Sequence, residues 1–172
     1  AIAALAPVSP DKTETLALSL AKYYRYTTNR NDEIWITIKD EAEALTAYLQ
    51  VEKIRMGEKL IFAFNISDDV SGVKIPKFLL QPLVENALKY GYHSEDDSTK
   101  INILAIKMDD ETLKISVCDS GKPFDDTMQI GTGINNVKDQ LKRFYPDGHS
   151  ISFVNEPVKC VEIELRNTNE RL

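Results

Sequence analysis

Hydrophobic residues recur along the chain at two spacings, which separate predicted helices from predicted strands. A helical repeat of apolar positions runs over 10–28, 40–56, 76–92 and 134–144. Short apolar or alternating runs predict strands over 34–38, 60–66, 100–108, 112–118, 150–155 and 159–165. This order predicts an α+β sandwich whose helices cover one face of a mixed or antiparallel sheet.

Residues with special backbone preferences mark where several of these elements end. Ser9 can cap the first helix and Pro10 suits its first position, while Gly57 is expected to end the second helix. Pro82 falls inside the third helix, so a kink or a restart is expected there. Residues 109–111 are predicted to form the tight turn of a hairpin, and 119–130 a mobile loop.

Composition and charge exclude several classes of protein. The 172 residues suit one ordinary domain, and a net charge of −6 with a pI near 5.0 disfavours binding to nucleic acid. No apolar run reaches the ~20 residues of a membrane span, and no secretory signal opens the chain. Cys118 and Cys160 form no CxxC pair and have only His93 and His149 to accompany them, so neither a zinc site nor a disulfide is expected. A reduced cytosolic protein is predicted.

The third helix carries the first candidate chemistry. One side of it is apolar, and Glu85, Asn86 and Lys89 project from the other, which would place a carboxylate, an amide and an ammonium in one stripe. Taken alone, such a stripe is more often a solvated helix face than a site, because amphipathic helices have polar stripes.

Two further motifs have chemistry that suits a nucleotide. Gly131, Thr132 and Gly133 precede a helix, and the unpaired amides at a helix start bind anions such as phosphate. Asp119 follows a strand, and an ionised carboxylate there would accept the exocyclic amine of adenine and disfavour guanine. Alone, the first motif is more often a turn before a helix, and the second a turn-forming aspartate.

The order and spacing of the three motifs resemble a known family. Residues 78–91 resemble the N box of LytS/YehU-type sensor histidine kinases, 119–121 their first glycine box, and 131–137 their second. Residues 24–26 and 51–57 are also similar to that family, so the resemblance covers nearly the whole chain.

This resemblance implies a two-layer α/β sandwich of the Bergerat (GHKL) ATPase type, preceded by a helical remnant. It implies that Asn86 holds Mg²⁺ through its amide oxygen, that Glu85 polarises the attacking nucleophile and that Lys89 neutralises phosphate charge. Phe124 and its neighbours would form the lid over ATP. The residues implied to bind ATP are Asn86, Lys89, Asp119, Gly121, Phe124, Gly131, Thr132 and Gly133.

Three departures from the family pattern alter what is expected. Pro123 stands where the first glycine box has its second glycine, which would stiffen the lid hinge and weaken nucleotide binding or alter its kinetics. Lys159 and Cys160 stand where relatives often have Gly-Thr, which puts a secondary adenine contact in doubt. Neither His93 nor His149 has the context of a phospho-acceptor, so the acceptor histidine is expected upstream of this chain.

The resemblance also implies how the chain is organised and what it meets. Residues 1–30 are expected to be the C-terminal part of a dimerisation and phospho-acceptor region, and 31–172 the ATP-binding catalytic domain. The γ-phosphoryl of ATP would pass to a histidine of the same or a partner subunit, and then to a response regulator. A cytoplasmic domain of a membrane-anchored homodimer is expected, with no direct membrane contact by this fragment.

Three alternatives remain open. The chain could be a pseudokinase that binds nucleotide and signals by conformation, which Pro123 favours. It could be another ATP-hydrolysing GHKL protein, such as a chaperone or mismatch-repair ATPase. It could also be a dimerisation module with an incidental glycine loop, which would gain no stability from Mg-ATP.

Overall fold

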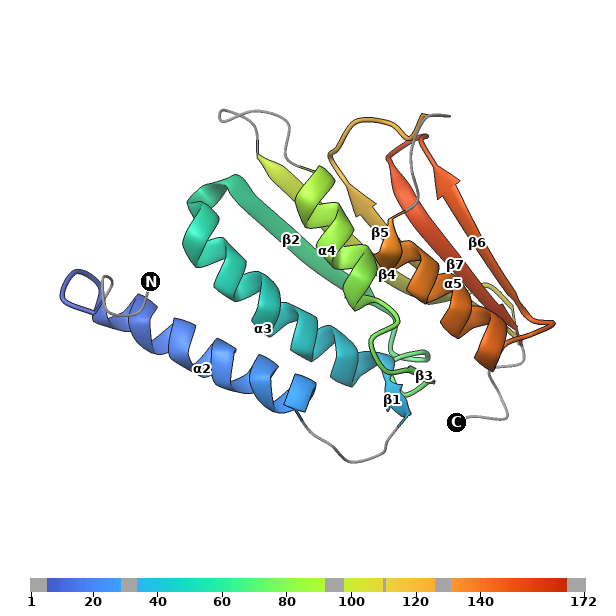
Figure 1. The fold of residues 1–172 in the computed structure, drawn as a ribbon, viewed down its shortest axis with the longest axis horizontal. Coiled ribbons are helices and arrows are strands. Elements are labelled where there is room, and N and C mark those ends of the chain that lie inside the picture. Colours follow the sequence, from blue (N-terminus) through green and yellow to red (C-terminus); the bar gives the residue numbers. More distant parts are fainter. Residues whose placement is uncertain (1–5, 29–33, 92–97, 110, 126–130, 167–172) are drawn as a thin grey trace.

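The computed structural model describes residues 6–28, 34–91, 98–109, 111–125 and 131–166, which form helices and strands in alternation (Figure 1). The elements are α2 (Pro10–Thr28), β1 (Trp35–Thr37), α3 (Ile38–Met56), the short 3₁₀ turn η1 (Gly57–Lys59), β2 (Leu60–Ile66), β3 (Lys74–Pro76), α4 (Gln81–Tyr90), β4 (Thr99–Lys107), β5 (Thr112–Asp119), α5 (Thr132–Phe144), β6 (His149–Val154) and β7 (Cys160–Arg166).

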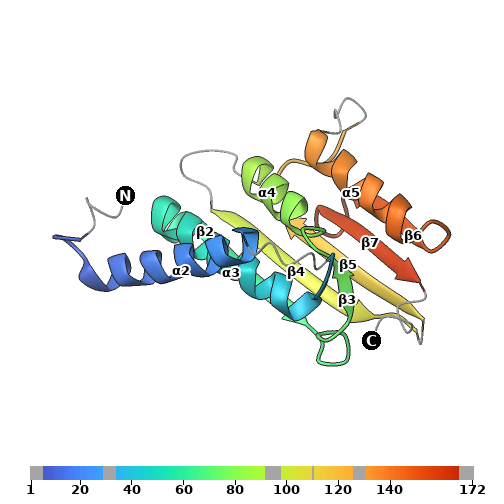
Figure 2. The same ribbon diagram turned by 60° about the horizontal axis from the view of Figure 1, so that its bottom comes forward.

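The main sheet has five strands in the order β2-β4-β5-β7-β6. β2 and β4 run parallel, and the other neighbouring pairs run antiparallel. Strands β1 and β3 form a separate two-stranded sheet. Helices α3, α4 and α5 lie on one face of the main sheet, as Figure 2 shows from below. The predicted α+β sandwich, with a mixed sheet covered on one face, is therefore confirmed.

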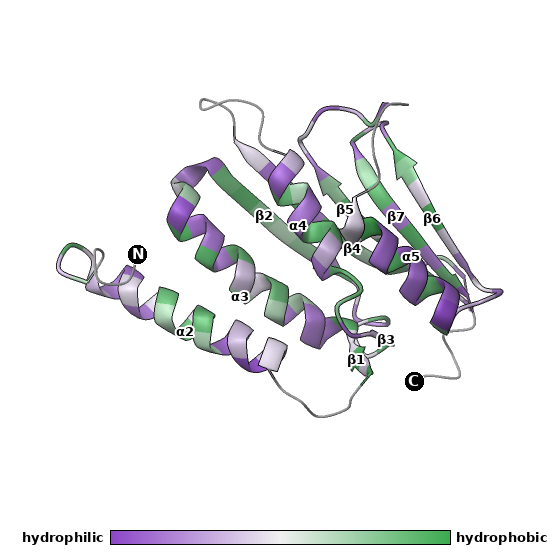
Figure 3. Ribbon diagram, viewed as in Figure 1, coloured by the Kyte–Doolittle hydropathy of each residue, from purple (hydrophilic) through white to green (hydrophobic). Residues whose placement is uncertain are grey.

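Alternation of residues along the strands places the core between the sheet and its helices. Ile101, Ile103 and Ala105 of β4 are buried beneath the helices. The buried face of α5 consists of Ile134, Val137 and Leu141, a spacing that matches the turn of an α-helix. Figure 3 shows the polar residues of α5 on its outer side. Burial of these apolar faces fixes α4 and α5 against the sheet.

Helix α2 packs along α3 outside this core. Its Tyr23 ring lies 5.4 Å from the Tyr48 ring of α3, and Lys22 forms an ion pair of 2.9 Å with Glu43. Leu16 is buried in the same contact. No described helix is both long and apolar enough to cross a bilayer.

The region predicted as one helix over 76–92 is divided differently. Residues 74–76 form β3, and α4 begins only at Gln81. Pro82 lies in the first helical turn, where its missing N–H has no intrahelical partner to lose, so a helix starts here, as the expected restart, and no kink forms. Tyr92, the predicted helix end, lies outside the described residues.

The other predicted boundaries are largely confirmed. Gly57 ends α3 with a φ of 66°, a conformation that side chains other than glycine rarely adopt. In the hairpin between β4 and β5, Asp109 Oδ1 accepts the N–H groups of Glu111 and Thr112 at 2.9 and 2.7 Å. Asp110 of the same turn lies outside the described residues.

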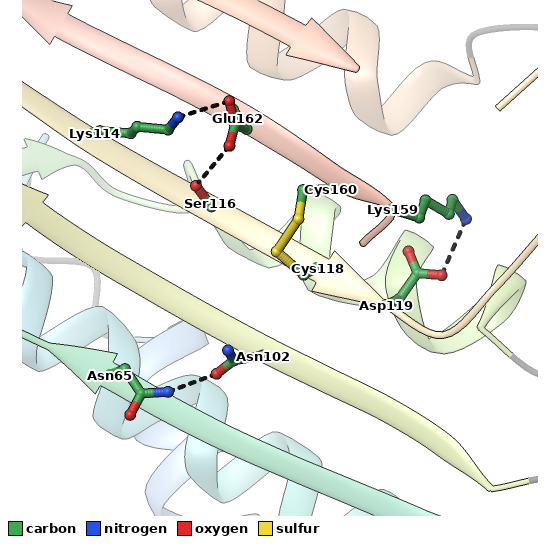
Figure 4. Close-up of a disulfide and its surroundings, with 9 residues drawn as sticks. All are labelled: Asn65, Asn102, Lys114, Ser116, Cys118, Asp119, Lys159, Cys160 and Glu162. Atoms are coloured by element: carbon green, nitrogen blue, oxygen red, sulfur yellow. Dashed lines mark hydrogen bonds and ion pairs between the residues drawn. A yellow bond between two sulfur atoms is a disulfide. The ribbon is translucent and has the colours of Figure 1, made fainter. Parts of the chain in front are cut away.

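The expectation that the cysteines remain unpaired is wrong. Cys118 of β5 lies directly opposite Cys160 of β7, and their sulfur atoms are bonded at 2.11 Å (Figure 4). Sequence spacing alone did not indicate this pair, because the two cysteines are 42 positions apart, with α5 and β6 between them. Only the strand register brings the two residues together.

Candidate functional site

Helix α4 is fixed at its start by a buried carboxylate. Glu41 of α3 is fully buried, and its Oε1 accepts the backbone N–H groups of Leu80 and Gln81 at 2.8 and 3.3 Å. The buried carboxylate thus occupies the positive end of the helix dipole. Burial raises the pKa of the Glu41 carboxyl to about 8. These bonds set the position from which α4 presents its polar residues.

Asp119 ends β5 inside the protein. Its side chain is 6% exposed, and its Oδ1 accepts the N–H of Gly121 at 2.7 Å. Lys159 Nζ donates a hydrogen bond to the same oxygen at 3.0 Å, and the Lys159 side chain is only 8% exposed (Figure 4). The carboxylate is therefore buried, paired and held by the turn that follows its strand.

Asn86 and Asp119, which are 33 positions apart, line one small cavity. Phe124, Lys159 and Ile134 line it too, and its volume is about 20 Å³. Ligand pockets usually measure ~300–1,000 Å³, so these side chains must move before a nucleotide can enter. Three of the residues implied to bind nucleotide, Asn86, Asp119 and Phe124, thus lie around one cavity, which is closed.

Two of the predicted site glycines, Gly121 and Gly133, lie so close to neighbouring atoms that an added Cβ would overlap them or contact them tightly. A Cβ on Gly121 would overlap Asp119 Oδ1 and the carbonyl oxygen of Tyr90. A Cβ on Gly133 would lie 3.3 Å from Pro82 Cβ and 3.8 Å from Asn86 Nδ2. Gly133 therefore lies beside the α4 residues that line the cavity, so both glycine motifs adjoin it.

The second glycine motif opens α5. Gly131 is the N-cap residue and has no side chain to bond the first-turn amides, and Thr132 is the first helical residue. Both are exposed. The start of α5 therefore offers backbone N–H groups beside α4, in the arrangement that binds anions.

Glu85 and Lys89 face a different hollow from Asn86. They line a groove of about 630 Å³ between α3 and α4, together with Tyr48, Glu52, Arg55, Met56, Lys59 and Leu88. Neither lines the cavity that contains Asn86 and Asp119. The single polar stripe expected on this helix is thus divided between two hollows, because successive helical residues point about 100° apart.

Glu85 is linked to α2 through one amide. Gln81 Nε2 donates to Glu85 Oε1 at 2.8 Å and to Tyr23 Oη at 2.7 Å. Burial raises the pKa of Tyr23, and the negative charge of Glu85 raises it further. A second α2 residue, Tyr26, accepts the N–H of Phe78 at 3.4 Å, and burial raises its pKa as well. The helix of residues 10–28 is thereby tied to the start of α4.

Phe124 is anchored on both sides of its backbone. Its N–H donates to Asn155 Oδ1 at 2.7 Å, and its carbonyl accepts Asn155 Nδ2 at 3.0 Å. Its ring meets Phe153 edge-on at 5.2 Å. Pro123 is exposed beside it. Residues 126–130, the remainder of the predicted lid, lie outside the described residues.

The histidines occupy the places that the sequence indicated, as far as they are described. His149 begins β6 after a turn, and its Nδ1 lies 2.5 Å from the carbonyl oxygen of Tyr145. His93 lies outside the described residues. No group of three or more His, Cys, Asp or Glu gathers among the residues described, so a metal here would depend on a different donor set.

Sequence reasoning missed the roles of Lys159 and Glu41. In the sequence, Lys159 is only a departure from the family pattern. Asp119 follows Cys118 and Lys159 precedes Cys160, so the antiparallel register that pairs the cysteines also places Asp119 opposite Lys159. From the sequence, Glu41 is simply one acidic residue of a predicted helix. Its position in the first turn of α3 gives no sign of the N–H groups of Leu80 and Gln81 that it accepts.

Comparison with known proteins finds sensor histidine kinases. Residues 1–60 match the family described as histidine kinase. The sensor histidine kinase BtsS of Escherichia coli K12 is 31% identical over 91% of this chain, and the sensor protein LytS of Bacillus subtilis 28% identical over 96%. The chain spans 28% and 30% of the length of these two relatives.

Solved structures share the fold. The catalytic domain of the histidine kinase ThkA gives a TM-score of 0.61 at 16% identity, over 77% of this chain and 95% of that domain. The histidine kinase domain of a blue-light activated kinase from Erythrobacter litoralis gives 0.60 at 13% identity, over 98% of this chain and 82% of that one. The chain is therefore homologous, over about nine tenths of its length, to sensor histidine kinases named BtsS and LytS, and it shares the fold of histidine kinase catalytic domains.

Proposed function

We propose that this chain is the ATP-binding catalytic domain of a two-component sensor histidine kinase, with residues 1–30 belonging to the dimerisation and phospho-acceptor region. The observation that supports it most is the cavity shared by Asn86 and Asp119, with Gly133 at its side. An amide oxygen can hold Mg²⁺, a buried acid can accept the amine of adenine, and a glycine-lined helix start can bind phosphates.

The base would be bound at Asp119. A carboxylate accepts hydrogen bonds, and the exocyclic amine of adenine donates them. Gly121 holds the carboxylate through its N–H and leaves space that any larger residue would fill. Phe124, at the wall of the cavity, would contact the base.

The phosphates would lie between α4 and the start of α5. Gly131, Thr132 and Gly133 would bind them through backbone N–H groups. Asn86 would hold Mg²⁺ through its amide oxygen, a hard donor for a hard cation that also binds phosphates and water. This donor set fits magnesium, which needs no cluster of acidic or histidine side chains when phosphates complete its coordination. Lys89 would neutralise phosphate charge from the neighbouring groove.

Glu85 would act on the phospho-acceptor. In the transfer, an imidazole nitrogen bonds to the γ-phosphorus as the bond between that phosphorus and the ADP oxygen breaks. Glu85 would polarise the imidazole by accepting its other N–H, and Gln81 holds the carboxylate in place. The acceptor would belong to the same or a partner subunit of a homodimer, and the phosphoryl group would then pass to a response regulator.

Two measurements test this function. Calorimetric titration should detect Mg-ATP binding by the chain, and binding at ~100 times the dissociation constant should raise its free energy of unfolding by about 2.7 kcal/mol. Mixing the chain with γ-labelled ATP and a helical fragment that carries the acceptor histidine of a LytS-type kinase should label the fragment. Failure to bind any nucleotide would contradict the proposal.

Pro123, which stands where the first glycine box has its second glycine, favours a second candidate, a pseudokinase that binds nucleotide and signals by conformation. Both candidates bind Mg-ATP, so binding does not separate them. Transfer does: a catalytic domain labels the fragment, and a pseudokinase leaves it unlabelled. Robust hydrolysis without any acceptor would instead favour another ATPase of the GHKL group.

A further inference from the structure

An internal cation occupies the carboxylate at which a nucleotide base would be bound. Lys159 Nζ lies 3.0 Å from Asp119 Oδ1, and it lies 4.8 Å from the centre of the Phe124 ring. The same oxygen already accepts the N–H of Gly121 at 2.7 Å. An amine from a ligand would therefore be left with the other carboxylate oxygen, Oδ2, and would lie beside the Lys159 ammonium, which repels a second N–H donor.

The lysine cannot leave this place as a whole, because its backbone is part of the sheet. Asp119 N–H donates to the carbonyl oxygen of Lys159 at 3.0 Å, and the next pair, Cys118 and Cys160, is bonded through sulfur. Only the side chain can move. Lys159 and Phe124 both line the cavity of about 20 Å³, so a base enters only if they are displaced.

Resting on the nucleotide binding proposed above, we infer that Lys159 is a specificity-determining residue. Its ammonium disfavours the 6-amino group of adenine beside Asp119, and it supplies a hydrogen-bond donor to a purine that carries an oxygen at this position.

The chemistry follows from the donors and acceptors present. A carboxylate alone accepts an amino group and repels a carbonyl oxygen, which favours adenine. An ammonium beside it has three donor hydrogens, so one can bond a 6-oxo group while another stays on Asp119. The amine of adenine is instead a donor placed beside a cation that also donates, so the ammonium disfavours it at Asp119. Lys159 thus weakens ATP binding and reduces the preference for ATP over inosine triphosphate (ITP).

The test compares Mg-ATP with Mg-ITP, because their bases differ only around the 6 position. Calorimetric titration of the chain should give dissociation constants within about threefold of each other. The variant Lys159→Met keeps an unbranched side chain of similar length and removes the cation. It should bind ATP at least tenfold more tightly and raise the preference for ATP over ITP by tenfold or more, the size expected for one buried hydrogen bond to a charged group.

A matched lysine in the same pair of strands is the control. Lys114 of β5 forms an ion pair of 2.8 Å with Glu162 of β7, away from the cavity, and Lys114→Met makes the same change of charge (Figure 4). It should leave both dissociation constants unchanged. Equal ATP affinity or an equal ATP-to-ITP ratio in Lys159→Met and the parent chain would overturn the inference.

The parent chain is informative even if Lys159→Met does not fold. A preference of thirtyfold or more for ATP over ITP in the unaltered chain contradicts a donor at the 6 position. Comparable binding of the two supports it. Absence of binding of either nucleotide to the parent and to Lys114→Met would instead refute the proposed nucleotide-binding function, and the inference with it.

Discussion

Glu41 Oε1 accepts the backbone N–H of Leu80 at 2.8 Å from inside the core. The carboxylate lies on α3 and the N–H at the start of α4, so one bond joins the two helices on which the site depends. Glu41 Oε2 has no hydrogen-bond partner among the described residues. A buried carboxyl in this setting retains its proton to higher pH than an exposed one.

Glu41 should make stability depend on pH in an unusual direction. Burial raises the pKa of this carboxyl from 4.5 to about 8 in the folded protein. Between these values the folded chain binds a proton that the unfolded chain has lost, so the stabilisation is complete below 4.5 and is lost as pH rises through 8. Urea unfolding between pH 5 and 9 should show a steeper decline for the parent than for Glu41→Gln. Glu43→Gln, an exposed change on the same helix, should match the parent; equal slopes in all three proteins would contradict the role of Glu41.

Asn86→Ala should remove most of the magnesium-dependent part of ATP binding. Alanine has no oxygen donor, and the loss should be about tenfold or more, measured by calorimetry with Mg²⁺ and with a chelator. The fold should remain intact by circular dichroism. Asn65→Ala, on β2 and bonded to Asn102 at 2.7 Å, is the control. Unchanged Mg-ATP affinity in Asn86→Ala would remove this residue from the metal site.

Gly121→Ala should disturb the Asp119 carboxylate, at which we propose that the base binds. The added methyl group would overlap Asp119 Oδ1 and the Tyr90 carbonyl, so the turn must shift at a cost of about 1–3 kcal/mol. Nucleotide affinity should fall with it. Gly72→Ala, where nothing lies within 4 Å of an added Cβ, should change neither quantity. Thermal melting and titration of both variants provide the comparison.

Gln81→Met should slow phosphoryl transfer and leave ATP affinity unchanged. Methionine keeps the length of the side chain and removes the amide that bonds Glu85 and Tyr23. Glu85 then loses its fixed position, although the cavity containing Asn86 keeps its lining. Single-turnover labelling of the acceptor fragment measures the rate, and a rate equal to that of the parent would show that Gln81 does not position Glu85.

Reduction of the disulfide should destabilise the chain without unfolding it. A bond that closes a loop of 42 residues contributes about 2–4 kcal/mol by restricting the unfolded chain. Urea unfolding with and without reductant should show this difference. The double variant Cys118→Ala, Cys160→Ala should be insensitive to reductant. Equal parent curves under both conditions would mean that the bond adds no stability.

The sequence predicts most of the fold because its local signals agree. Apolar spacing locates α2, α3 and α5, and Gly57 marks a helix end correctly. The predicted helix over 76–92 began too early, and the reason is tertiary. The apolar run continues through β3 and the turn after it, and only pairing with β1 makes residues 74–76 a strand.

The site is less predictable, because its distances are set by register. Motif order correctly indicated that Asn86 and Asp119 lie near one another, since both line one cavity. It could not indicate that Glu85 and Lys89 face a second groove, nor that Lys159 lines the cavity. The packing of α4 decides which groove Glu85 and Lys89 face. The pairing of β5 with β7 decides where the Lys159 side chain lies.

Cys118 and Asp119 are adjacent residues of β5, so their side chains point to opposite sides of the sheet. Cys118 is bonded to Cys160, and Asp119 is paired with Lys159. The sulfur bridge lies on the side without helices, and the carboxylate on the side that the helices cover (Figure 4). The two links are therefore one peptide unit apart along the chain, although they lie on opposite faces of the sheet.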